Sequence, residues 1–130
     1  MANPRTNQTN TMENGGDVNL YAQFVAGASG VVGAVARRSG FGTIVKTAAT
    51  TGLYDFPLSE AWLALLDWSV NVIQASFSAS GAVFGDVTVD NVATGSAPKV
   101  RVTFYTAAGA PVNLASGDVV RLRIALKARA

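Results

Sequence analysis

The 130-residue sequence contains no cysteine and no histidine, and each absence excludes a class of chemistry. Without cysteine the chain has no disulfide framework, no thiolate nucleophile and no zinc–thiolate site. Without histidine it lacks the commonest general base and the commonest transition-metal ligand. A Ser-His-Asp triad cannot be completed, and no serine stands in a Gly-x-Ser-x-Gly motif. We therefore expect a protein without enzyme activity that needs no cofactor.

Charge is also scarce. Charged residues make up 14% of the sequence and hydrophobic residues 49%, whereas ordinary soluble domains carry about 25% charged residues. No run of about 20 apolar residues is present, so we expect no membrane-spanning helix. Met1 to Asp17 lacks the basic start and the apolar core of a signal peptide. A small domain with so little charge is expected to bury part of its surface against copies of itself.

The few charges are unevenly placed along the chain. Residues 1–98 carry four Lys/Arg and seven Asp/Glu, a balance of −3, whereas residues 99–130 carry six Lys/Arg and one aspartate, a balance of +5. A basic final third could serve nucleic acid, an acidic protein partner or only a solvated strand face. No aromatic residues interleave with the basic ones as stacking platforms for bases would. We therefore expect no nucleic-acid partner.

Residues 18–130 read as one domain of short strands separated by turn residues. We expect strands over residues 18–24, 31–36, 41–49, 53–56, 68–77, 83–92, 98–106 and 120–127. Ser59 to Leu66 contains good helix formers and predicts a helical turn or an irregular crossing. About eight strands without a long helix favour an all-β, jelly-roll-like β-sandwich. Met1 to Asp17 is a polar arm that either frays or becomes ordered against a neighbouring subunit.

Alternation predicts which side chains of each strand face the core. In the last two strands the inward residues should be Val100, Val102 and Phe104, and then Val120, Leu122, Ile124 and Leu126. Val87 and Val89 should face inward in the strand before them. Arg121, Arg123 and Lys127 should face outward.

One strand shows a change of phase. Trp68, Val70 and Val72 share one face, whereas Ile73, Ala75 and Phe77 share the other. Either a β-bulge lies between Val72 and Ile73, or both faces of this strand are buried, one of them by a neighbouring subunit.

The remaining candidate sites are weak. The aspartates and Glu60 stand at turns and strand ends, where such residues favour local hydrogen bonds. Asp86 and Asp90 lack the alternating acids and the glycine of a calcium loop. Trp62 or Trp68 could stack on a sugar, but packing in the core or at a subunit contact is the simpler interpretation.

Four segments carry a resemblance to a known family: Gly42 to Thr47, Gly52 to Pro57, Leu63 to Leu66, and Ser116 to Arg123. In strand order and punctuation the chain resembles the capsid decoration, or cement, proteins of tailed bacteriophages, which have jelly-roll folds. The resemblance covers roughly residues 40–127. It implies a virion structural protein, assembled in the host cytoplasm, that sits as a homotrimer on the capsid exterior.

The resemblance also implies partners and surfaces. The partners would be other copies of the chain and the major capsid protein. Apolar strand faces such as that of Trp68, Val70 and Val72 would form the trimer, and outward Arg121, Arg123 and Lys127 would meet an acidic capsid surface. Two alternatives stay open: a phage tail or head–tail connector subunit, and a small carbohydrate-binding β-sandwich that uses Trp62 or Trp68.

Overall fold

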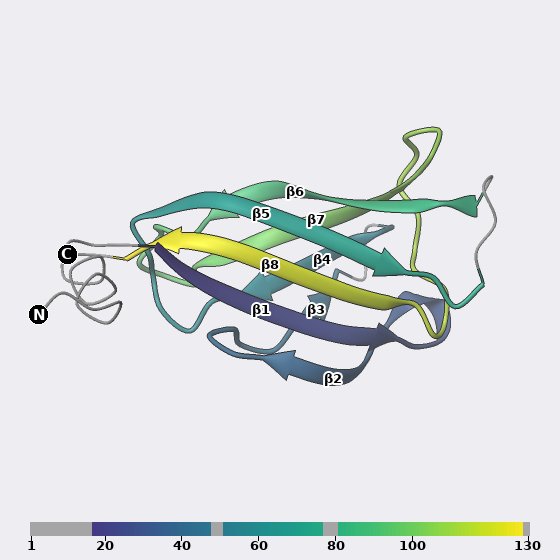
Figure 1. Ribbon diagram of the computed structural model, residues 1–130, viewed down its shortest axis with the longest axis horizontal. Helices are drawn as coiled ribbons and strands as arrows, with labels where there is room; N and C mark the ends of the chain where they lie inside the picture. The colour runs from purple at the N-terminus through teal and green to yellow at the C-terminus, as the bar shows by residue number, and fades with distance from the viewer. Residues whose placement is uncertain (1–16, 48–50, 77–80, 129–130) are drawn as a thin grey trace, which may run out of the picture.

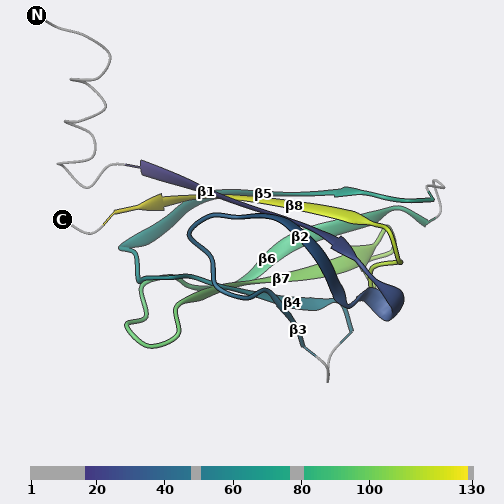
Figure 2. The same cartoon turned by 90° about the horizontal axis from the view of Figure 1, so that it is seen from below.

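A computed structural model describes residues 17–47, 51–76 and 81–128, which form two packed β-sheets (Figures 1 and 2). The first sheet has the strand order β2-β1-β8-β5 and the second β3-β4-β7-β6, and all pairings are antiparallel. The strands are β1 (Asp17–Ala26), β2 (Val32–Arg38), β3 (Val45–Lys46), β4 (Leu53–Pro57), β5 (Ala64–Ile73), β6 (Val83–Asn91), β7 (Lys99–Thr106) and β8 (Val119–Lys127). One short 3₁₀ turn, η1 (Ala28–Gly30), joins β1 to β2.

The connections between the sheets confirm the predicted β-sandwich of eight strands. β7 lies beside β4 and β8 lies beside β5, so later strands return next to earlier ones as in Greek-key folds. The first and last strands, β1 and β8, are neighbours in an uninterrupted register from Asp17–Lys127 to Val25–Val119. β5 and β6, the terminal strands of the two sheets on one side, contact each other. β2 and β3 form the opposite side of the sandwich (Figure 1).

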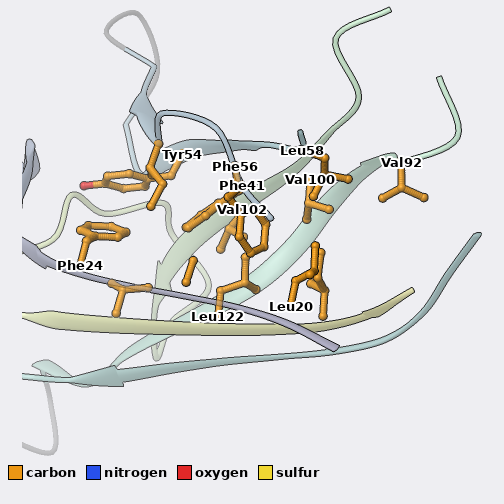
Figure 3. Close-up of a cluster of buried hydrophobic side chains, with 14 of the residues drawn as sticks. Leu20, Phe24, Phe41, Tyr54, Phe56, Leu58, Val92, Val100, Val102 and Leu122 are labelled. Atoms are coloured by element: carbon orange, nitrogen blue, oxygen red, sulfur yellow. The ribbon is translucent and has the colours of Figure 1, made fainter. Parts of the chain in front are cut away.

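The core lies between the sheets and is built by the predicted alternation. Along β7 and β8 every residue expected to face inward is buried. The centre is aromatic: the ring centroids of Phe24 and Tyr54 are 5.6 Å apart, and those of Tyr54 and Phe104 are 5.3 Å apart and nearly perpendicular. Such tilted and edge-to-face pairs add to the hydrophobic gain of burying large rings. Figure 3 shows Phe24, Tyr54, Phe56 and Phe41 in this cluster.

Three expectations about local structure are decided by the structure, one between its two alternatives and two as corrections. Of the two alternatives for Ser59 to Leu66, the structure forms the irregular crossing: residues 59–63 pass between the sheets without a helical turn, and β5 begins at Ala64. The crossing is anchored by backbone bonds from Trp62 N to Val92 O and from Leu63 N to Lys127 O. Of the strand expected over residues 41–49, residues 48 and 49 lie outside the described residues, and within 41–47 only Val45–Lys46 forms a strand, with one isolated bridge at Phe41.

The third expectation concerns Val89, which was expected to face inward. The pairing of β6 with β7 shifts between Val87 and Val89, so Val87 opposes buried Val102 but Val89 opposes Arg101. The extra residue, Thr88, makes a β-bulge that turns the next side chain to the other face. The inward prediction for Val89 is therefore wrong.

The structure excludes one of the two explanations for the phase change in β5. The pairing with β8 is continuous from Asp67 to Ile73, so no bulge lies between Val72 and Ile73; the irregularity lies between Leu65 and Asp67. Ile73 points outward, and both Ile73 and Leu66 are exposed. The predicted arm, Met1 to Asp17, lies outside the described residues except for Asp17, which begins β1.

Candidate functional site

The three side chains predicted to form an oligomer interface lie on one face of β5. Trp68, Val70 and Val72 are paired with β8 residues whose own side chains are buried, so this face is turned toward the interior of the sandwich. Val70 and Val72 pack against the core. Trp68 leaves 37% of its surface exposed. Of the three, Trp68 is thus the one with most surface available to a partner.

Five exposed apolar side chains are distributed along β5 and β6. They come from β5, from β6 and from the residue just before β5: Leu63, Leu66, Trp68, Ile73 and Phe84, of which Phe84 is 58% exposed. Two hollows lie between the strands. One, of about 370 Å³, includes Leu66, Trp68 and Asp90 in its lining, and the other, of about 420 Å³, includes Val72 and Phe84. Five of the nine large apolar side chains exposed in the described residues thus lie on or next to β5 and β6.

The predicted capsid-contact residues lie on the outer face of the first sheet. Arg121 Nε donates to Oε1 of Gln23 at 3.2 Å, and Arg123 Nη1 donates to Oδ1 of Asn19 at 3.3 Å. Both acceptors lie on β1: Gln23 stands directly opposite Arg121 in the register, and Asn19 stands opposite Ala125, two residues along β8 from Arg123. Lys127 lies on the same side of β8, opposite Asp17.

Arg123 also holds a carboxylate on β5. Its Nη2 atom lies 3.0 Å from Oδ2 of Asp67. The hydrogen bond from Arg123 lowers the pKa of the exposed Asp67 carboxyl. A hollow of about 420 Å³ lies over this face, with Tyr21, Ser69, Asn71 and the two arginines in its lining. Since each guanidinium has five N–H donors, both retain donors that an acidic partner could use.

The basic residues of β7 are placed differently. Arg101 donates to both carboxylate oxygens of Asp55 on β4, from Nε at 2.7 Å and from Nη2 at 3.2 Å, and Lys99 Nζ lies 3.3 Å from Oδ2. These contacts lower the pKa of Asp55, with the hydrogen bond from Arg101 as the largest cause, and raise that of Arg101. Sequence reasoning counted Lys99 and Arg101 as part of a basic surface and missed this cluster. Lys99 and Arg101 stand at alternate positions of β7 and indicate a charged face. Only the pairing of β7 with β4 shows that Asp55 lies opposite Arg101.

The two tryptophans differ in accessibility. Trp62 is only 9% exposed and its indole Nε1 has no hydrogen-bond partner within the described part of the chain, so its ring is not available for stacking on a sugar. Trp68 lines the hollow of about 370 Å³ together with Asp67 and Asp90. A glycan site on this protein would therefore have to use Trp68.

In residues 17–47, 51–76 and 81–128, no group of three or more acidic side chains is arranged to hold a metal ion. Asp90 Oδ1 instead accepts the backbone N–H of Val92 at 3.2 Å, a local bond of the kind expected for aspartate at a strand end. No helix in these residues has the length and apolar character needed to cross a membrane. A scan against protein-family models finds no match, and searches of curated proteins and of solved structures find none either.

Proposed function

We propose that this protein is a virion structural protein, a homo-oligomeric decoration or cement protein on the exterior of a tailed-phage capsid. The observation that carries the proposal is the concentration of exposed apolar side chains along β5 and β6 in a chain with few charges. Monomeric proteins rarely expose continuous apolar surface unless a partner covers it. The resemblance noted in the sequence is the reason for proposing a phage capsid as the assembly.

The proposal assigns self-association and capsid binding to two different surfaces. The apolar side formed by β5 and β6 associates with other copies, and Arg121, Arg123 and Lys127 bind acidic groups of the major capsid protein. The two arginines are already oriented by Gln23, Asn19 and Asp67, so less conformational entropy is lost when they meet carboxylates. One such contact is weak. Several copies held in one oligomer bind more tightly through multivalency.

Capsid binding is tested with empty shells of the major capsid protein from the same phage. Purified protein mixed with shells should co-sediment with them to saturation and raise the temperature at which the shells break open. Arg121→Ala/Arg123→Ala should reduce co-sedimentation at least tenfold, because two charge-assisted contacts per copy are lost. Arg121→Lys/Arg123→Lys keeps the charge and serves as the control, with a smaller loss. Absence of binding to shells, together with incorporation into tails, would replace the capsid role with the tail or connector role.

A carbohydrate-binding sandwich is the second candidate, because exposed Trp68 stands beside Asp67 and Asp90 around one hollow. A tryptophan face with nearby carboxylate acceptors is a suitable platform for a sugar ring. Binding of the wild-type protein to a glycan array, abolished in Trp68→Ala and retained in Trp62→Phe, would favour this function. Absence of glycan binding by the wild-type protein would remove it.

A further inference from the structure

Charges are segregated between the two sides of the sandwich. Residues 27–47, which include β2 and β3, carry three bases and no acid: Arg37, Arg38 and Lys46. Residues 58–91, which include β5 and β6, carry four acids and no base: Glu60, Asp67, Asp86 and Asp90. β2 and β3 are the terminal strands of the two sheets on one side, and β5 and β6 are those on the other (Figures 1 and 2). We call these sides the basic edge and the acidic edge.

Most of these charges are not neutralised within the monomer. Asp67 is held by Arg123, but within the described residues Asp86 and Asp90 form no ion pair, and neither do Arg38 and Lys46. Asp86, Asp90 and Arg38 are exposed and Lys46 is half-buried. Each edge therefore presents net charge of one sign to whatever lies against it.

Apolar exposure is confined to the same two edges with one exception. The basic edge shows exposed valines before or within β2 and β3: Val31, Val35 and Val45. The acidic edge shows the five side chains described above. The exception is Tyr21, which is exposed and lies on β1. Both edges thus combine apolar side chains with uncompensated charge, and the signs of that charge are opposite.

We infer that copies of this chain associate head to tail, with the acidic edge of one copy against the basic edge of the next. This inference rests on the homo-oligomeric part of the proposed function and adds which surfaces meet. Pairing two identical edges would place like charges together, whereas pairing the two different edges places Asp86 and Asp90 opposite Arg38 and Lys46. Charge complementarity of this kind selects the partner and the register.

Strand direction supports the same arrangement. In the first sheet β2 runs antiparallel to β1, β1 to β8 and β8 to β5, so β5 and β2 run in opposite directions. When two copies stand side by side in one orientation, β5 of the first is antiparallel to β2 of the second. The backbone groups on the free sides of both strands can then pair, which removes two exposed sheet edges at once. A head-to-tail contact of this type closes into a ring when the rotation between copies allows it.

Charge reversal tests the inference in solution. Asp86→Lys/Asp90→Lys makes the acidic edge basic, and Arg38→Glu/Lys46→Glu makes the basic edge acidic. Light scattering should show that each double variant falls to the 13.4 kDa of one chain, because its two edges now repel each other. The quadruple variant has both edges reversed and should recover the oligomer. Persistence of the oligomer in either double variant, or no recovery in a folded quadruple variant, would overturn the inference.

Cross-linking gives a second readout that does not depend on altered charges. Because the chain has no cysteine, Ala36→Cys on β2 and Asn71→Cys on β5 each introduce a single thiol. A short bismaleimide should link the two variants when they are mixed, but should link neither variant to itself. Ala108→Cys, exposed in the turn after β7, is the control and should not become cross-linked to the β2 variant or to the β5 variant. Equal linking of one variant with itself would show identical edges in contact and would contradict the head-to-tail arrangement, as would no linking in the mixture.

The two proposals fail separately. Loss of head-to-tail association with shell binding intact would leave the capsid role standing. Head-to-tail rings that do not bind shells would refute the capsid role and leave the assembly mode standing.

Discussion

A Cβ atom at Gly85 of β6 would lie only 2.4 Å from Cγ1 of Val70 on β5, so the absence of a side chain at Gly85 makes room for the valine. The same Cβ would lie 2.9 Å from Cε1 of Phe104. This fit lets β5 and β6, the terminal strands of the two sheets, approach each other. These two strands form the acidic edge.

Gly85→Ala should therefore destabilise the fold even though alanine suits a strand better than glycine does. Overpacking of one methyl group against Val70 and Phe104 should cost about 1–3 kcal/mol of unfolding free energy. Denaturant titration followed by tryptophan fluorescence measures it. Gly95→Ala is the matched control, because no atom lies within 4 Å of the added Cβ, and it should change stability by less than about 0.5 kcal/mol. Equal effects of the two substitutions would contradict the close approach of β5 and β6.

Asp118 is a buried carboxylate that joins two loops. It is 2% exposed, its Oδ1 accepts the N–H of Ala75 at 3.0 Å, and its Oδ2 accepts the N–H of Ala115 at 2.9 Å. Asp118→Asn leaves one of these donors facing an amide NH₂ and should cost about 1–3 kcal/mol. Asp17→Asn, at an exposed site outside both charged edges, should be close to neutral when the same unfolding free energy is measured. A loss no larger for Asp118→Asn than for Asp17→Asn would show that these two bonds contribute little.

Tyr54 should titrate late. Its hydroxyl donates to the carbonyl of Gly30, and burial raises its pKa to about 12 from 10.0. The unfolded chain loses this proton near pH 10 and the folded chain only near pH 12, so stability should fall with rising pH between these values. Absorbance at alkaline pH should show a late phenolate phase that Tyr54→Phe removes and Tyr105→Phe retains. A late phase that survives in Tyr54→Phe would refute the assignment.

The cluster of Asp55, Arg101 and Lys99 predicts a pH dependence of the opposite sign. Because the pKa of Asp55 is lowered from 3.8 in the folded state, its stabilising effect is present above about pH 4 and is lost as the pH falls below that value. Asp55→Asn should cost about 1 kcal/mol at pH 7, and the difference from wild type should shrink at acidic pH. Asp67→Asn, whose carboxylate is more exposed, is the comparison and should have the smaller effect. A cost for Asp55→Asn that does not change with pH would contradict the ion-pair origin.

Alternation alone predicted the parts of the fold where one face is plainly buried. In β7 and β8 the residues expected to face inward occupy every second position, and the structure buries all of them. It failed at Val89 because the β-bulge at Thr88 turns the next side chain to the opposite face of the sheet. The neighbouring sequence carries no pattern that would predict an inserted residue. At Ser59 to Leu66 the sequence left a helical turn and an irregular crossing open; the crossing forms because its backbone bonds and the burial of Trp62 outweigh helix propensity.

The candidate surfaces were harder to predict than the fold. The outward position of Arg121 and Arg123 followed from the period of the strand, but their contacts with Asn19 and Asp67 depend on strands far apart in sequence. The same holds for the two charged edges. The bases of residues 27–47 and the acids of residues 58–91 become opposite sides of one molecule only through the strand order of the sheets.

Self-association is the central claim, and the mass of the purified full-length protein in solution tests it most directly. Sedimentation equilibrium at low salt should give the mass of two or more copies of the 13.4 kDa chain. High salt should shift the population toward the single chain, because salt screens the attraction between the exposed charges of the two edges. A single species of 13.4 kDa at every salt and protein concentration would contradict the account.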